Sequence, residues 1–215
     1  MGVSAREAVL AKIRAAKGGA SHAAAVREGW SAVAREYIQS ATRERVEVLD
    51  LLVDRLLDYD AQVVRVGRDG VRDAVGRMLA ARGVRRMVVP AGMTAEVLPE
   101  GIEFVVDEGL SAVALDGFDG VVTGSTLAIA ETGTVVLQNV AGQGRRAVAL
   151  VPDYHLCVVD AADVVETVSE AMERLGGTSG LTTTFFSGPS ATADIEMTRI
   201  KGVHGPRFLD VVLVE

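Results

Sequence analysis

The sequence predicts an α/β protein with a mostly parallel sheet flanked by helices and a helical extension at the N-terminus. Short valine-rich runs alternate with amphipathic stretches from residue 61 onward, which is the pattern of strands that alternate with helices. Aromatic residues make up 4% of the 215 residues and hydrophobic residues 49%. Valine, leucine and alanine must therefore fill the interior, as in buried parallel sheets. We expect one compact domain overall, with a helical extension over 1–60 and the α/β domain over 61–215.

Two helical patterns occupy the extension. Ser4 and Glu7 form a capping-box pattern at the start of residues 4–18, in which Val9 and Ile13 share a face. Apolar residues recur at helical spacing over 42–60, with charges between them.

The expected elements of the α/β domain follow in order along the chain. Helices are expected at 69–83, 162–177 and 191–200, and strands at 61–66, 85–90, 102–107, 118–124, 155–160, 182–188 and 208–215. The run "LAIAETGTVVLQN" at 127–139 has two apolar arms about a polar centre, which predicts a hairpin.

Charge and composition exclude several classes of protein. The net charge is −7 and the basic residues are spread along the chain, so we expect no nucleic-acid surface, although a local cluster can still bind a small anion. The single Cys157 excludes an internal disulfide and a cysteine-ligated iron-sulfur cluster built from this chain alone. No apolar run reaches the ~18 residues of a membrane span, and the start lacks a signal-peptide core. We therefore expect a cytoplasmic protein without membrane segments.

Some local patterns favour structural interpretations. "GQGRRA" at 142–147 fits a dinucleotide fingerprint, but Pro152 follows too soon for the helix that this fingerprint requires. A glycine-rich turn is the favoured interpretation. His22, His155 and His204 lack metal-ligand spacing, so no metal site is predicted. His155 opens an apolar strand, where a hydrogen-bonded structural histidine is expected.

Glu131 interrupts an otherwise apolar stretch. Because burying an unpaired carboxylate is costly, Glu131 either emerges at an exposed turn or points into a cleft, held by hydroxyls and amides. Thr132 and Thr134 can supply the hydroxyls, and Gly133 permits close backbone approach. In the second case Glu131 is a candidate catalytic acid, base or nucleophile.

Two other segments are candidates for ligand binding. Thr123, Gly124 and Ser125 end a predicted parallel strand, and ligands of open α/β sheets lie beyond such carboxyl ends. Arg145 and Arg146 follow flexible backbone and either grip a carboxylate or phosphate or form a solvated pair.

The segment "SGPSATADIEMTRIKGVHGP" at 187–206 is rich in turns, hydroxyls and charges. A helix over 191–200, capped by Ser190 or Thr192, would present free amides to an anion. His204 lies between glycines as a candidate titratable catalytic group. The candidate ligand-binding residues of this segment are Ser187, Gly188, Ser190, Asp194, Glu196, Gly202 and Gly205.

Three motifs in this order resemble the LUD domain family, specifically its lactate utilisation branch: "TGSTLAIAETGTVVL", "GRRAVALVPDYHLCVV" and "SGPSATADIEMTRIKGVHGP". The resemblance makes residues 61–215 a LUD-type domain. It implies a fold like that of the ribose-5-phosphate isomerase, glucosamine-phosphate deaminase and CoA-transferase superfamily. It also implies a part in the oxidation of L-lactate to pyruvate, beside two iron-sulfur partner proteins, and leaves any cofactor unknown.

Two functions follow from these patterns. The first is a non-redox component of a lactate-oxidising assembly that binds a small anionic ligand. The alternative is an independent enzyme of the CoA-transferase or formyltetrahydrofolate cyclo-ligase type that uses Glu131. In either case we expect the candidate segments to line one cleft at the carboxyl edge of the sheet.

Overall fold

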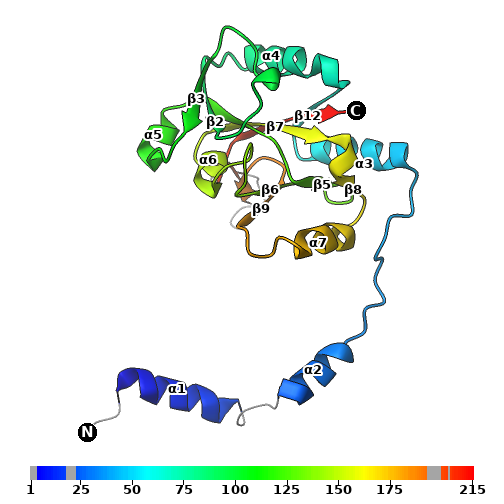
Figure 1. The fold of residues 1–215 in the computed structure, drawn as a ribbon, viewed down its shortest axis with the longest axis vertical. Helices are drawn as coiled ribbons and strands as arrows, with labels where there is room; N and C mark the ends of the chain where they lie inside the picture. Colours follow the sequence, from blue (N-terminus) through cyan, green and yellow to red (C-terminus); the bar gives the residue numbers. More distant parts are fainter. Residues whose placement is uncertain (1–3, 18–22, 193–199, 203) are drawn as a thin grey trace. The chain divides into compact units, whose positions relative to one another are not determined.

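The structure is a computed structural model that describes residues 4–17, 23–192, 200–202 and 204–215 (Figure 1). The chain divides into two compact units, Met1–Tyr37 and Ile38–Glu215. The first unit holds two helices, α1 (Ala5–Ala16) and α2 (Ala23–Ser31). At the start of α1, Ser4 and Glu7 form the predicted capping box: the Glu7 amide donates to Ser4 Oγ at 3.2 Å, and the Ser4 amide donates to Glu7 Oε2 at 2.9 Å.

A six-stranded sheet, parallel throughout, forms the centre of the second unit. Its strands lie in the order β1 (Gln62–Val66), β12 (Phe208–Val214), β7 (Tyr154–Asp160), β4 (Gly120–Thr123), β2 (Arg86–Pro90) and β3 (Glu103–Asp107). The predicted α/β fold with a mostly parallel sheet is confirmed.

Alternate residues of the central strands point to opposite faces of the sheet. Val212 and Val214 of β12 pack in one apolar cluster with helix α4 (Val71–Ala81). Val211 and Leu213 pack in another, with helix α3 (Arg45–Asp58) and a second sheet. Because both faces are covered, the strands are nearly continuous apolar runs, as the sequence showed.

The second sheet has the strand order β8 (Val164–Val165), β5 (Leu127–Ile129), β6 (Thr134–Gln138) and β9 (Thr183–Ser187). Strands β5 and β6 form the predicted hairpin, with Ala128 opposite Val135. Helix α7 (Val168–Gly176) contacts β5 and β8. The short helix α5 (Ala112–Asp116) connects β3 to β4, and the short helix α6 (Arg146–Leu150) connects β6 of the second sheet to β7 of the main sheet.

The prediction of a helix over 191–200 is wrong at both ends of this range. Ala191–Thr192 (β10) and Ile200–Lys201 (β11) pair as an antiparallel ribbon, and 193–199 lie outside the described residues. The ribbon continues into a turn in which the Gly202 amide donates to the Ser190 carbonyl at 2.8 Å. The anion site that depended on the start of this helix therefore loses its basis.

Helix α3, which we expected to belong to the N-terminal extension, packs on the α/β unit. Its residues Leu52 and Leu56 are fully buried in the cluster between the two sheets. Among the described helices, none has both the length and the apolar character that crossing a bilayer requires.

Candidate functional site

The carboxyl edge of the main sheet encloses a cavity of about 480 Å³. All six strands run in the same direction, so the loops that follow them meet at this edge. The residues after β1, β2, β4 and β7 line the cavity together with the loop between β6 and α6. This is the edge at which open α/β sheets bind ligands.

One wall of the cavity is made of glycines. The Gly124 amide donates to the Gly142 carbonyl at 2.8 Å, and the Gly142 amide donates to the Ala91 carbonyl at 2.9 Å. Gly92 has a φ of 81°, and a Cβ there would lie 2.7 Å from the Cβ of Ala141. Gly92 therefore has no room for a side chain, and the three glycines keep this wall of the cavity free of side chains.

The opposite wall, after β1 and β7, is charged. Arg68 Nη2 lies 2.5 Å from Asp160 Oδ2, and the Arg68 side chain is 73% exposed. The Ala162 amide and, to a lesser extent, Arg68 lower the pKa of Asp160 below its usual range. Asp163 and Glu96 also line the cavity. This wall can accept hydrogen bonds from a ligand, and Arg68 can turn toward an anion.

Thr123 lies beneath this cavity and not in its wall. Its Oγ1 lies 2.7 Å from His155 Nε2, and both residues are fully buried. Burial lowers the pKa of His155 to about 3 and raises that of Cys157, next along this chain of contacts, to about 12. Among the described buried side chains, His155 Nδ1 has no hydrogen-bond partner. The prediction of a hydrogen-bonded structural histidine is confirmed.

Arg145 also lies near the carboxyl edge, but it already has a partner. Its Nε and Nη2 donate to the two carboxylate oxygens of Asp107 at 2.7 and 2.9 Å, and Nη2 also donates to the Leu110 carbonyl. The Arg145 bond is the main reason why the pKa of Asp107 is lowered. Arg145 thus fixes the loop after β3, whereas the neighbouring Arg146 is exposed.

Glu131 lies at the exposed tip of the β5–β6 hairpin. Its amide donates to the Glu166 carbonyl at 3.0 Å. Beside it, Thr134 Oγ1 lies 2.7 Å from both Thr132 Oγ1 and Ser187 Oγ. Gly133 packs against helix α3, where a Cβ would come within 2.9 Å of the Arg55 carbonyl carbon.

The remaining candidates form the turn that leads into β12. The Ser190 amide donates to the Pro206 carbonyl at 2.8 Å, and the His204 amide donates to Ser190 Oγ at 3.0 Å. Gly205 packs on Ser190, and Gly202 packs on the Arg207 side chain. Asp194 and Glu196 lie outside the described residues.

The candidates therefore divide between opposite edges of the sheet. Gly188 packs against Tyr59, just before β1, and Pro206 lies just before β12, so these segments are at the amino edge. The hairpin tip lies beside them through the Thr134–Ser187 contact. Of the described candidates, Thr123, Gly124, Ser125 and the two arginines lie toward the carboxyl edge, so the described candidates do not line a single cleft. Sequence reasoning missed Arg68, Gly92 and Asp160, although Asp160 ends a predicted strand and the other two lie two residues after one.

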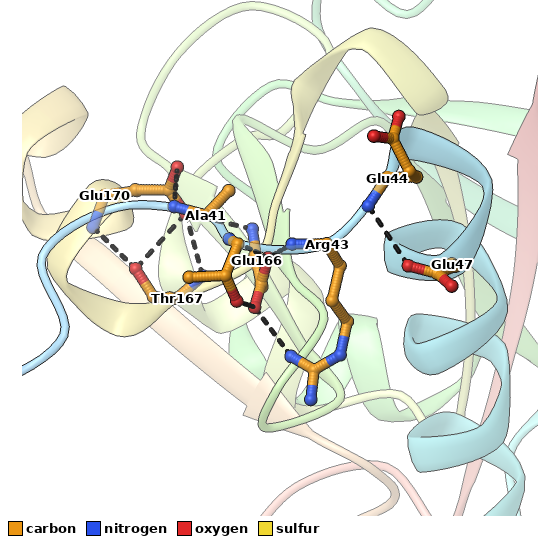
Figure 2. A network of polar contacts seen from close by, with 8 residues as sticks. Ala41, Arg43, Glu44, Glu47, Glu166, Thr167 and Glu170 are labelled. Carbon is orange, nitrogen blue, oxygen red and sulfur yellow. Dashed lines mark hydrogen bonds and ion pairs between the residues drawn. The ribbon is translucent and has the colours of Figure 1, made fainter.

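A second polar centre, also missed, lies between β8 and the residues 38–45, which we call the strap (Figure 2). Glu166 is 3% exposed, and its Oε2 accepts the amides of Thr42 and Arg43 at 2.8 and 2.9 Å. Its Oε1 accepts Arg43 Nη1 at 2.6 Å and Thr42 Oγ1 at 3.2 Å. Glu170 accepts the Ala41 amide at 3.1 Å. These carboxylates hold the strap against α7 and β8.

Within the described ranges, no group of three or more His, Cys, Asp or Glu side chains is arranged to hold a metal ion.

Comparison with known proteins places these features in a family. The LUD domain matches residues 112–214. A lactate utilization protein C of Deinococcus radiodurans is 43% identical over 181 residues, which cover 83% of this chain and 84% of that protein. A lactate utilization protein C of Bacillus subtilis is 35% identical over 99 residues, 43% of this chain and 41% of that protein. The crystal structure of a DUF162 family protein from Deinococcus radiodurans superposes with a TM-score of 0.72 at 40% identity, covering 81% of this chain and all of that one.

Proposed function

Since the chain belongs to the LUD domain family, we propose that it takes part in lactate utilisation as a non-redox component. The observation that carries the proposal is the 43% identity to a lactate utilization protein C over most of both chains. Identity at this level over 181 residues supports a shared role as well as a shared fold.

The proposed partners are iron-sulfur proteins of the same system. Oxidation of lactate to pyruvate releases two electrons, and some protein of the system must accept them. Cys157 is the only cysteine of the chain and is fully buried, so a cysteine-ligated cluster cannot be built from this chain alone. The electron carriers in this proposal are therefore other proteins, and the setting is the cytoplasm, where the LUD chain binds a ligand or organises the assembly.

The proposed ligand is a small anion in the carboxyl-edge cavity. Gly92, Gly124 and Gly142 supply a wall without side chains, which leaves room for a small ligand, and Arg68 supplies a positive charge for its carboxylate. Asp160 can accept a hydrogen bond from a hydroxyl on the same ligand. A 2-hydroxy acid carries both groups, so its carboxylate suits Arg68 and its hydroxyl suits Asp160.

Growth and binding test these two parts separately. We expect a deletion strain to lose growth on L-lactate and to keep growth on pyruvate, and the intact gene should restore it. Undiminished growth on L-lactate would refute the role. For the ligand, calorimetric titration with L-lactate and with pyruvate should show binding that Arg68→Gln weakens about tenfold or more, whereas Arg77→Gln on the exposed side of α4 leaves it unchanged. Equal affinity in both variants would remove Arg68 from the site.

No observation favours the alternative enzyme that uses Glu131. A nucleophile must reach its substrate in a shielded site, whereas Glu131 is exposed on the amino edge, away from the cavity. Trapping of an acyl group on Glu131 after incubation with an acyl-CoA would reverse this choice.

A further inference from the structure

A second cavity, of about 330 Å³, lies at the amino edge of the main sheet, at the other end of the strands from the carboxyl-edge cavity. Its lining comes from the residues that lead into four neighbouring strands, β12, β7, β4 and β2. The volume falls within the range of about 300–1,000 Å³ that is usual for small-molecule sites. We call it the amino-edge cavity.

The amino-edge cavity has a wall on each face of the sheet. Arg82 follows helix α4, which packs with Met87 of β2 in one apolar cluster. Asp116 ends helix α5, which packs with Val88 of β2 in another. Met87 and Val88 are neighbours in the strand and point to opposite faces. Arg82 and Asp116 therefore approach the cavity from opposite faces, and a ligand there lies between a basic and an acidic wall.

Arg82 presents donors in a fixed position. Its Nη2 and Nε donate to the buried carboxylate of Asp210 at 2.7 and 3.3 Å, and Tyr154 Oη donates to the same carboxylate at 2.7 Å. The guanidinium lies 4.6 Å from the ring centre of Phe208. A guanidinium has five N–H groups, and within the described part of the chain Arg82 Nη1 has no acceptor. Since the side chain is 26% exposed, its free N–H groups can bind an anionic oxygen.

The acidic wall carries two carboxylates without a cationic partner among the described residues. Asp119 Oδ2 accepts the amides of residues 85 and 86 at 2.7 and 2.9 Å, which fixes this carboxylate and leaves Oδ1 open. Asp116 is exposed and forms no ion pair within the described ranges. Asp153, the third carboxylate of the lining, already pairs with Arg207. Two negative charges therefore remain for a ligand to neutralise.

These groups determine which charges a ligand must carry. The free N–H groups of Arg82 require one anionic group, and the two unpaired carboxylates require two cationic groups. We propose that the amino-edge cavity binds a basic amino acid, with its carboxylate on Arg82 and its two cationic groups beside Asp116 and Asp119. The ring of Phe208, which also lines the cavity, suits the apolar part of such a side chain. The proposal stands independently of the lactate role, because the two cavities lie at opposite edges of the sheet.

Calorimetric titration of the full chain with matched ligands tests the proposal on the unchanged protein. L-Arginine should bind, whereas L-glutamate, which has a net negative charge, should not. Agmatine is arginine without its carboxylate, and it should bind at least tenfold more weakly because the charge-assisted bond to Arg82 is lost. L-Citrulline has the shape of arginine without the side-chain charge. It should bind about threefold to fivefold more weakly, since it loses one ion pair at the exposed acidic wall.

Substitutions locate the ligand in the amino-edge cavity. Asp116→Asn and Asp119→Asn should each weaken the binding of L-arginine about threefold to fivefold. Asp73→Asn, the same change on exposed α4 outside the cavity lining, is the control. Arg82→Lys keeps a charge beside Asp210 but removes the free N–H groups, so it should bind L-arginine and agmatine nearly alike. If Arg82→Lys does not fold, the comparison of the two ligands on wild type decides the same point.

Three results would overturn the proposal. The first is no binding of L-arginine or L-lysine at millimolar concentration. The second is agmatine that binds wild type as tightly as L-arginine, since the carboxylate then has no partner in the site. The third is equal affinity of the Asp116→Asn, Asp119→Asn and Asp73→Asn variants for L-arginine, since the ligand then binds elsewhere.

Discussion

Replacing Glu166 by glutamine should release the strap from the α/β unit. Both carboxylate oxygens of Glu166 are used, and each accepts two hydrogen bonds from Thr42 or Arg43 (Figure 2). Glutamine keeps one oxygen and replaces the other by an NH₂ group. If the NH₂ group replaces Oε2, the amides of Thr42 and Arg43 lose their acceptor. If it replaces Oε1, Arg43 Nη1 loses its acceptor, whereas the Thr42 hydroxyl can turn and accept from the NH₂ group.

The size of the effect follows from this count. Each hydrogen bond to a buried carboxylate contributes about 1–2 kcal/mol net, so the loss of one or two should lower the free energy of unfolding by ~1–4 kcal/mol. The difference should depend on pH. The hydrogen bond from the Arg43 amide lowers the pKa of Glu166 most. The hydrogen bonds from the Thr42 amide and hydroxyl lower it further. The carboxylate therefore stabilises the fold fully above the ordinary carboxyl pKa, and this contribution is lost as pH falls through the lowered value. Wild type and variant should converge in acid.

Urea unfolding at neutral pH measures the global effect, and trypsin cleavage after Arg43 reports the strap itself. We expect Glu166→Gln to lower the unfolding midpoint without changing the slope and to speed cleavage at Arg43 by tenfold or more. Glu108→Gln, which removes the same charge from an exposed loop, should change neither. Indistinguishable behaviour of the two variants would show that the strap is not held by this carboxylate.

Three further predictions concern residues that the sequence singled out, one expected to be structural and two considered as ligand-binding candidates. Because burial lowers the pKa of His155 to about 3, its ring should stay neutral, with no change in its NMR shifts between pH 5 and 8. In the unfolded chain the ring of His155 binds a proton near pH 6.5. The wild type should therefore lose stability between pH 6.5 and 3 more steeply than His155→Leu. Parallel curves of unfolding free energy against pH would contradict the buried neutral ring. Arg145→Ala should cost ~1.5–3 kcal/mol in urea unfolding because it leaves Asp107 unpaired, whereas Arg146→Ala should cost under ~0.5 kcal/mol; equal costs would rule out the ion pair as the cause. Gly188→Ala should lower stability by ~2 kcal/mol or more, because φ is 79° and a Cβ would lie 2.4 Å from the Tyr59 Cβ, whereas Gly180→Ala has open space and should be tolerated; a fully stable Gly188→Ala protein would refute the close contact.

The fold was predictable because its signals are local. Valine-rich runs between amphipathic stretches predicted the parallel strands β1, β2, β3, β7 and β12, and a Glu-Thr-Gly-Thr centre predicted the hairpin. Each signal depends on the periodicity of a few neighbouring residues, which burial on one or two faces imposes directly. Ser4 and Glu7 predicted a cap for the same reason, since the hydrogen bonds join residues three apart.

The segment 191–200 shows where local reasoning fails. Its sequence permits a helix, and Ser190 is a good N-cap residue. In the structure, the Ser190 amide donates to Pro206, and its hydroxyl accepts from the His204 amide. These partners lie 14 or more residues further along the chain, and together they direct β10 toward pairing with β11. Tertiary hydrogen bonds thus override a helical propensity that amounts to a few tenths of a kcal/mol per residue.

The candidate site was predicted only in part, because polarity was taken as a sign of ligand contact. Thr123, Arg145 and Thr134 are polar because they pair with His155, Asp107 and Ser187 inside the protein. The position of the cavity, in contrast, follows from topology, since it lies where parallel strands end. Arg68, Gly92 and Asp160 carry no motif of their own, so only knowledge of the strand order brings them together.

The motifs that resemble the LUD domain family therefore lie partly at the amino edge of the sheet and partly at its carboxyl edge. At the amino edge, the hairpin tip and the turn before β12 are occupied by contacts within the chain: Gly133 against Arg55, Gly188 against Tyr59, Ser190 with Pro206. Residues with such contacts fix the packing of the second sheet and of α3, so a substitution there changes stability first. At the carboxyl edge, Gly124 and Gly142 also bond to each other, but beside a cavity of about 480 Å³ that the side chains leave open. A substitution that leaves the loops in place, such as Arg68→Gln, can then change binding without changing the fold. For this reason the proposed ligand is best tested by substitutions at the carboxyl edge.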